Sequence, residues 1–260
     1  MTDRLADITA RIDGIGQLGQ VVNAMRGIAA AIGEVLTLLP PPKDAAPEPS
    51  RTALVVFCAE QGFVGGFGEA VLRAIEAEAT TTPLLVVGTR GLASLAERDI
   101  APLWSAAMPS HTLGIPRLAD RIAEAVYGHV VSGDIDALDA VFSLRSPGQP
   151  ITVQRRRLFP LDPAAFHRAS AGNPPLLTLK PEVLLRELTA EYLHAQLCAI
   201  ALHAFAAEND ARMEAMAQAH GQIDRQLGEL RAVQRRVRQD EITAEIIELA
   251  AGAEVGLRGR

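Results

Sequence analysis

The chain has 260 residues, of which 48% are hydrophobic, 22% are charged and only 4% are aromatic, and its net charge is -6. This length can bury one sizeable core or two modest ones, and the acidic balance argues against a general nucleic-acid binder. The two cysteines, Cys58 and Cys198, show no metal-ligand spacing and are expected to be buried thiols of a reducing compartment. We expect neither a metal site nor a cofactor.

The first segment, residues 1–40, is predicted to be a helix that ends at the triple proline of residues 40–42, because proline cannot continue a helix. Its apolar and small residues recur in alternating steps of three and four, which is the heptad pattern of a coiled coil. The heptad positions are Leu5, Ile8, Ile12, Ile15, Gly19, Val22, Arg26, Ala29, Gly33 and Leu36.

The middle segment, residues 51–175, alternates short apolar runs with helical patterns, which predicts an α/β domain with helices packed on a sheet. Its stretch AEQGFVGGFGEAV resembles a phosphate-binding loop between a strand and a helix. The spacing does not fit: the one G-x-G is Gly66-Phe67-Gly68, Val71 stands where the third glycine belongs, and no Lys-Ser or Lys-Thr follows. A structural role for these glycines is therefore favoured over a ligand site.

The acidic residues Asp134, Asp136 and Asp139 could in principle gather a cation, but the spacing of a calcium loop is missing, so a solvated turn is favoured. The run Arg155-Arg156-Arg157 is explained equally well by a solvent-facing strand and by an acidic partner. No nucleophile–base arrangement can be assembled from the sequence.

The last segment, residues 181–255, contains no proline after Pro181 and is predicted to be one long helix. Three-four alternation runs from Leu188 to Val237, with Met213 and Met216 at positions expected to be core and His220 as a polar layer. The alternation changes phase at Ile242, beside a basic stretch that holds Arg231, Arg235, Arg236 and Arg238. Since a lone heptad helix cannot bury its apolar stripe, we expect it to pair with residues 1–40 as a long antiparallel coiled coil, with the α/β domain between them.

Membrane segments are not expected. No signal peptide opens the chain, and the apolar stretch CAIALHAFAA, interrupted by His203, is shorter than the ~20 residues that a membrane span needs. We therefore expect a cytoplasmic protein.

Four stretches, spread over nearly the whole chain, carry a family resemblance. NAMRGIAAA, QGFVGGFGE, AENDARMEAM and VRQDEITAEIIELAAGA resemble, in family order, motifs of the gamma subunit of F-type ATP synthases. The triple proline, Gln61 and Phe63 depart from the family pattern, which suggests a divergent branch.

The resemblance implies a non-catalytic subunit: the central rotor stalk, whose coiled coil stands inside the hexamer of alpha and beta subunits. Its Rossmann-like α/β domain would form a foot on the c-ring and bind the epsilon subunit, at the cytoplasmic face of the bacterial membrane as a peripheral protein. Ring rotation driven by ion flow would then force the catalytic beta subunits through their conformations. By motif match, Arg238 and Gln239 would contact the beta subunits, and Met25 and Arg26 would lie on the shaft and face the same surface of the beta subunits.

Two other functional classes remain open at this stage. One is a non-rotary coiled-coil adaptor, and the other is a nucleotide-binding α/β protein, which the failed glycine fingerprint disfavours.

Overall fold

The computed structural model describes residues 2–40, 50–146, 148–166 and 176–258, which form two compact units, Met1–Arg212 and Met213–Arg260. The last helix, α5, begins in the first unit and makes up the second. In chain order the elements are α1 (Thr2–Leu38), β1 (Thr52–Phe57), α2 (Phe67–Ile75), β2 (Leu84–Val87), α3 (Thr89–Ala96), β3 (Trp104–Ala106), the 3-10 turn η1 (Thr112–Gly114), α4 (Ile115–Val131), β4 (Ala137–Leu144), β5 (Thr152–Phe159), the 3-10 turn η2 (Pro163–Ala165) and α5 (Pro181–Arg258).

The first unit is built around a five-stranded sheet with the order β3-β2-β1-β4-β5. The strands β1, β2, β3 and β4 are parallel, with Val55 opposite Leu85 on one side and Ala140 on the other. β5 joins β4 in the antiparallel direction and forms one edge of the sheet. The mixed α/β fold expected from the sequence is thereby confirmed.

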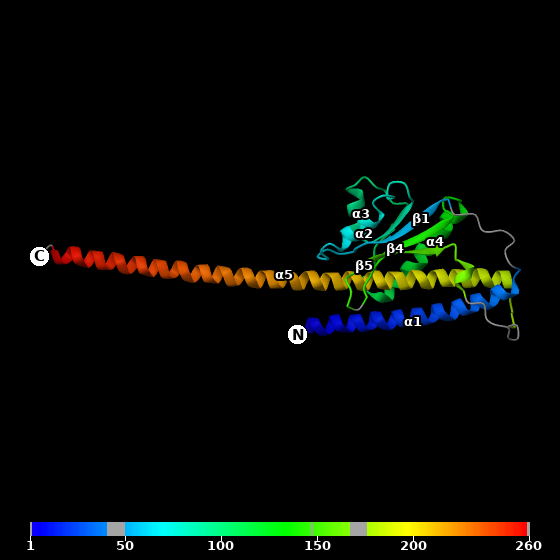
Figure 1. Ribbon diagram of the computed structural model, residues 1–260, viewed down its shortest axis with the longest axis horizontal. Coiled ribbons are helices and arrows are strands. Elements are labelled where there is room, and N and C mark those ends of the chain that lie inside the picture. Colours follow the sequence, from blue (N-terminus) through cyan, green and yellow to red (C-terminus); the bar gives the residue numbers. More distant parts are fainter. Residues whose placement is uncertain (1, 41–49, 147, 167–175, 259–260) are drawn as a thin grey trace. The chain divides into compact units, whose positions relative to one another are not determined.

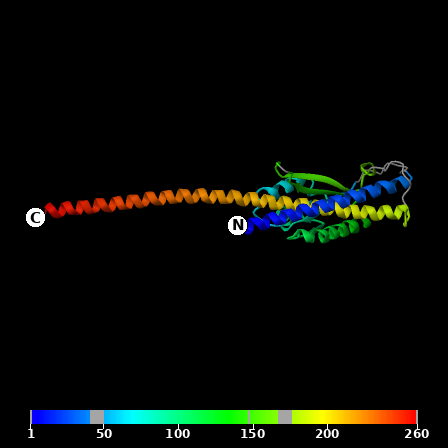
Figure 2. The same ribbon diagram turned by 90° about the horizontal axis from the view of Figure 1, so that it is seen from below.

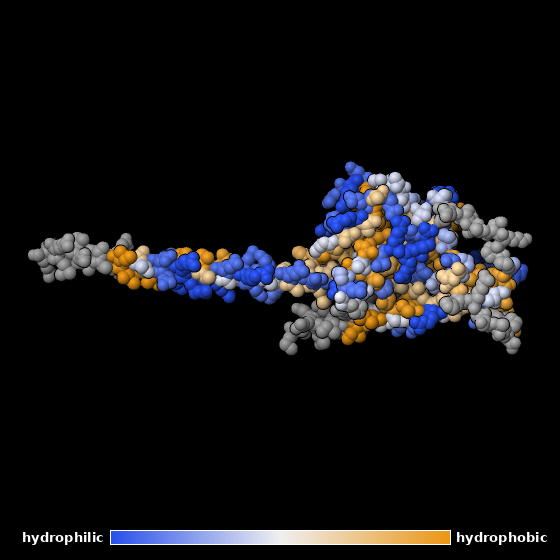
Figure 3. Space-filling model, in the orientation of Figure 1, coloured by the Kyte–Doolittle hydropathy of each residue, from blue (hydrophilic) through white to orange (hydrophobic). Residues whose placement is uncertain are grey.

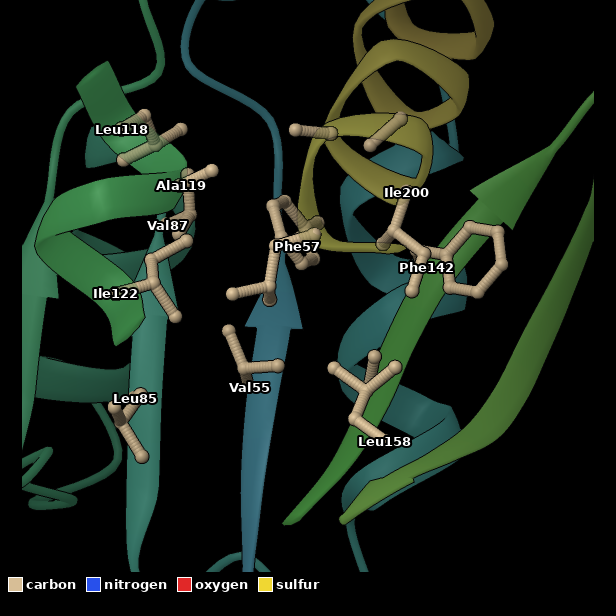
Figure 4. Close-up of a cluster of buried hydrophobic side chains, with 14 of the residues drawn as sticks. Val55, Phe57, Leu85, Val87, Leu118, Ala119, Ile122, Phe142, Leu158 and Ile200 are labelled. Carbon is tan, nitrogen blue, oxygen red and sulfur yellow. The ribbon is translucent and has the colours of Figure 1, made fainter. Parts of the chain in front are cut away.

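Helices cover both faces of this sheet, because the central strands are mostly apolar and side chains alternate between the faces. On β1, Leu54 and Val56 pack in a cluster with residues of α2 and α3. Val55 and Phe57 point to the opposite face, where they pack in the cluster that α4 and α5 supply (Figure 4). The core of the first unit is thus two apolar layers, one on each side of the sheet.

The first part of α5 is a core helix of the α/β domain. Every residue from Ala195 to Leu202 is buried, and Leu197 and Cys198 belong to the cluster on the sheet. Ile200 of the same cluster points toward the sheet beside Phe57 and Phe142 (Figure 4). The heptad pattern predicts burial on one stripe only. Burial on every side follows instead from the sequence CAIALHAF, which is apolar all around the helix.

Helix α1 runs through the first unit in the direction opposite to the first part of α5 (Figures 1 and 2). It ends at Leu38, just before the prolines, as its sequence predicts. The predicted heptad register is wrong by one residue: Ile32 and Val35, each one position before a predicted site, are buried at 2%, whereas Ile12 and Ile15, at predicted sites, are 63% and 64% exposed. Gly14 lies nearest to Thr112 of η1. Within the described chain, α1 therefore leaves much of its apolar surface open.

His203 of α5 stacks on Phe142 of β4, with ring centroids 6.3 Å apart, and the guanidinium of Arg156 lies over the Phe142 ring at 5.5 Å. Burial first, and then the charge of Arg156, lower the pKa of His203 below its ordinary value of 6.5. The charged imidazolium is therefore disfavoured in the folded state and costs nothing in the unfolded chain.

Because the folded pKa lies below the unfolded one, His203 contributes stability that is complete above about pH 6.5 and is lost as the pH falls through the folded pKa. We expect the melting temperature to fall between pH 7.5 and pH 5.5, and to fall less in His203→Phe, which keeps the ring stacking without the titration. His111 is exposed, so His111→Phe serves as the control and should show the same fall in melting temperature between the two pH values as the wild type. An equal fall in all three proteins would contradict the assignment.

Candidate functional site

The glycine-rich stretch after β1 is held by a buried carboxylate of α5. The backbone N–H groups of Glu60 and Gln61 donate to the Glu208 carboxylate at 3.1 and 3.0 Å. Glu208 is only 5% exposed and also accepts a bond of 2.5 Å from the guanidinium of Arg212. The two resembling stretches QGFVGGFGE and AENDARMEAM thus meet in space, although they are far apart in the sequence.

The carboxylate of Glu60 binds further backbone groups at the carboxyl ends of the parallel strands. Glu60 accepts the backbone N–H groups of Thr89 and Met108 at 3.0 and 2.8 Å, and it also bonds the Thr89 hydroxyl. These amides follow the carboxyl ends of β1, β2 and β3, where an open α/β sheet binds a nucleotide phosphate. Here two glutamates occupy them and bring negative charge. This arrangement disfavours a phosphate site and gives the loop a structural role.

The three aspartates considered as cation ligands each bind groups of the protein itself. Asp134 accepts from His129 and Ser132, which hold its pKa below the ordinary value, and Asp136 accepts the backbone N–H groups of Ser50 and Arg51. In the parts of the chain that the structure describes, no cluster of metal-ligating side chains occurs.

Asp139 does not lie in a solvated turn, so that interpretation is corrected for this residue. It is 5% exposed on β4, and it pairs with Arg155 at 2.8 Å and with Arg157. Arg155 also reaches Glu78 of the α2–β2 connection at 2.6 Å. Strand pairing brings the acid opposite the arginine run of β5, and therefore two of the three arginines already have acidic partners within the chain.

The sequence pattern did not reveal a row of contacting side chains formed by Cys198, His194 and Asp120. The Cys198 sulfur lies 3.4 Å from His194 Nε2, and His194 Nδ1 lies 3.1 Å from Asp120. The i,i+4 spacing of His194 and Cys198 could have revealed the first pair, but the contact with α4 could not be foreseen. Burial raises the pKa of Cys198 to about 11, so the group is a protonated thiol at neutral pH and not an activated nucleophile.

The four residues expected to touch the beta subunits lie on helix surfaces. On α1, Met25 is half-buried and Arg26 is exposed; on α5, Arg238 and Gln239 are exposed and belong to the second unit. Among the described residues, no ion pair engages the Arg238 guanidinium.

The second unit is a single helix segment with an uncovered apolar stripe. Ile223, Leu230 and Ile246 are 55%, 65% and 60% exposed. Met213 and Met216, expected as core, are each 46% exposed, because one helix cannot cover its own apolar side. In Figure 3 this part of α5 shows hydrophobic groups among hydrophilic ones. Apolar side chains repeated along an exposed helix are typical of a surface that binds other chains.

The expectation that no segment is apolar enough to cross a membrane is also corrected. By length and composition alone, Ile12–Leu38 of α1 could do so, with a mean hydropathy of 1.4 and 17% of the stretch buried. The core helix of a soluble protein also passes this test of length and composition. His220 of α5, expected as a polar layer of the heptad pattern, contacts Asp224 on the same helix.

An α/β domain that continues into a long helix with an uncovered apolar and basic surface defines a protein that works through contacts with other chains. A family model described as ATP synthase matches residues 33–255, and the chain belongs to that family. The match spans both the α/β domain and the second unit.

The curated relatives are gamma chains. The ATP synthase gamma chain of Geobacter sp. (strain M21) is 27% identical, over 90% of this chain and 85% of its own length. The ATP synthase gamma chain of Chlorobaculum tepidum is 24% identical, over 96% of this chain and 98% of its own length.

Solved structures share the fold. In Euglena gracilis mitochondrial ATP synthase (OSCP/F1/c-ring), a chain matches with a TM-score of 0.60 and 13% identity, over 96% of this chain and 95% of its own. In the central stalk and c-ring structure of the Tetrahymena thermophila mitochondrial ATP synthase, a chain matches with a TM-score of 0.57 and 15% identity, over 85% of this chain and 100% of its own.

Proposed function

We propose that this chain is the gamma subunit, the central rotor stalk, of an ATP synthase. The observation that carries the proposal is the single family match, which covers the α/β domain together with a second unit whose apolar stripe is uncovered. A helix with an exposed stripe requires partner chains, and gamma chains are the relatives whose sequences align with it.

In this role the chain carries out no chemistry itself. The catalytic beta subunits and the alpha subunits would surround the second unit, and the α/β domain would bind the epsilon subunit and the c-ring. Ion-driven rotation of the ring would turn α5, and its asymmetric surface would drive the beta subunits through their conformations. The protein would lie at the cytoplasmic face of a bacterial membrane as a peripheral component.

The beta-subunit contact is proposed at Arg238 and Gln239 of α5 and at Met25 and Arg26 of α1. Arg238 and Gln239 offer a guanidinium and an amide next to one another on an exposed helix, and both groups donate hydrogen bonds to carboxylates. Four arginines between Arg231 and Arg238 add positive charge, which favours an acidic partner surface.

The finer architecture belongs to the same proposal. In the assembly, α1 and α5 would pair as an antiparallel coiled coil, which their opposite directions in the first unit and their heptad patterns support (Figure 1). The central domain would be Rossmann-like, which the strand order supports. The domains would then be residues 1–40, 51–175 and 181–255.

The experiment that tests this function is coexpression of the chain with the alpha and beta subunits from its own genome. We expect one copy per hexamer, and ATP turnover that depends on the chain. An adaptor would join the hexamer without changing turnover. A nucleotide-binding protein would bind ATP in equilibrium dialysis of the isolated chain, where we expect no binding. Absence of assembly with the hexamer would overturn the proposal.

A further inference from the structure

The buried carboxylate of Glu208 ties α5 to the α/β domain at the end of the first unit. It receives the backbone N–H groups of Glu60 and Gln61, and its partner Arg212 is the residue directly before the second unit. Each oxygen of the carboxylate therefore accepts a backbone donor from the loop after β1. The helix cannot turn or slide past this loop without breaking both bonds.

The loop after β1 is in turn hydrogen-bonded to the segments that follow β2 and β3. Glu60 accepts N–H groups of Thr89, which follows β2, and of Met108, which follows β3. A continuous set of hydrogen bonds thus runs from α5 through the loop after β1 to the segments that follow two further strands. We call this set the clasp; it consists of Glu208, Arg212, Glu60 and the backbone N–H groups of Gln61, Thr89 and Met108.

The apolar contacts around the clasp do not fix the helix by themselves. They are made by Ala207 and Ala211 of α5 against Ala59 and Phe67, and alanine side chains have little shape to interlock. Hydrophobic contact is non-directional, whereas hydrogen bonds need a defined distance and angle, and those to an ionised carboxylate are the stronger kind. At the last turn of α5 within the first unit, the clasp therefore adds directional contacts to the position that Leu197 and Ile200 already give the helix in the sheet cluster.

We infer that the clasp is the torque-bearing joint between the α/β domain and α5, and that Glu208 is a positioning residue for rotary coupling; this inference rests on the rotor function proposed above. The second unit consists of α5 alone, so torque between a ring-bound α/β domain and the second unit passes along this helix. The clasp lies at the last turn of α5 before the second unit, beside the Arg145–Asp210 ion pair, so this is where the domain holds the helix against torque from the second unit.

The coupling test uses Glu208→Gln in the complete complex, reconstituted in vesicles, with ATP hydrolysis and ion uptake measured on the same preparation. Glutamine has the size of glutamate but presents an NH2 group to one of the two loop N–H groups, so one bond is lost and two donors face each other. We expect hydrolysis within about twofold of the wild type and ion uptake per ATP lowered roughly threefold or more, because the last turn of α5 within the first unit yields under torque.

Two variants serve as controls. Ile122→Val removes a methyl group from the fully buried core and lowers stability without touching the clasp, and Glu191→Gln removes a carboxylate from the exposed side of α5. Both should keep the wild-type ratio of ion uptake to hydrolysis. Parallel loss of hydrolysis and uptake in Glu208→Gln, or an unchanged ratio, would overturn the inference.

A second measurement does not depend on the partners. In the isolated chain, hydrogen exchange at the amides of Glu60 and Gln61 should speed up in Glu208→Gln and stay slow in Ile122→Val. Unchanged exchange would show that the clasp does not hold the loop. If the wild-type complex fails to couple at all while this exchange result is obtained, the rotor function has failed and the clasp geometry stands.

Discussion

Alanine at both Arg238 and Gln239 is expected to lower the ATP turnover of the assembled complex at least about tenfold. A hydrogen bond to a charged group is worth roughly 1.5–3 kcal/mol, and about 1.4 kcal/mol of lost transition-state stabilisation corresponds to a tenfold loss of rate. Two such contacts, if made to carboxylates of the beta subunit as proposed, would exceed that amount. Steady-state ATPase activity of the purified complex, with subunit stoichiometry checked in parallel, is the measurement.

The chain supplies a closely matched control for this experiment. Arg225 and Gln226 form the same dipeptide in the second unit, and both side chains are exposed. Alanine at both of these positions removes the same charge and the same amide from the same helix, and turnover should stay within about twofold of the wild type. Equal losses in the two double variants would indicate a general effect of charge or helix stability, and would refute a specific contact.

Gly91→Ala should destabilise the first unit severely. Gly91 is buried in the first turn of α3, and a Cβ placed on it would collide with both Cβ and Sγ of Cys58 at the end of β1. Cys58 is itself only 2% exposed, so its side chain cannot move aside into solvent. Forcing a methyl group into a packed core costs about 1–3 kcal/mol and sometimes more. Urea unfolding of the isolated protein measures the loss.

Gly128→Ala is the matched control, because Gly128 lies in α4 with nothing near the position of a Cβ. Alanine there should raise stability by roughly 0.4–1 kcal/mol. In addition, Cys58→Gly combined with Gly91→Ala removes the colliding side chain and should recover part of the stability lost in Gly91→Ala alone. If Gly91→Ala unfolds at the same urea concentration as the wild type, the close approach of α3 to β1 is wrong.

Periodicity predicted the elements of the chain better than it predicted their surroundings. The end of α1 before the prolines and the unbroken course of α5 followed from proline chemistry and the three-four alternation. What covers each helix did not follow. Residues 195–202 of α5 satisfy a heptad pattern, yet they are buried on all sides against the sheet, because period alone does not distinguish a coiled coil from a core helix with small apolar side chains.

The spacing of the glycines showed which ligand the loop is unsuited to bind, but it did not show which group the loop does bind. The missing third glycine argued against a phosphate site. The anionic group that the loop binds instead is the Glu208 carboxylate, which lies 147 residues beyond Gln61 and is recognisable only in three dimensions. The same holds for Asp139, which composition assigns to a turn and strand pairing places opposite Arg157. Arg238 and Gln239 were singled out by family resemblance, and their contact remains a prediction.

The burial of α5 against the sheet sets an order for folding during synthesis. β1 and β4 have one face closed by Leu197, Ile200 and Ala201, which the ribosome adds after every strand has been made. Until these residues emerge, the part of this face that α4 does not cover is exposed to water, and such species are prone to aggregate. The α/β domain and the first part of α5 therefore mature as one cooperative body, and a chain cut shortly after β5 should be a substrate for chaperones and proteases rather than a smaller folded protein.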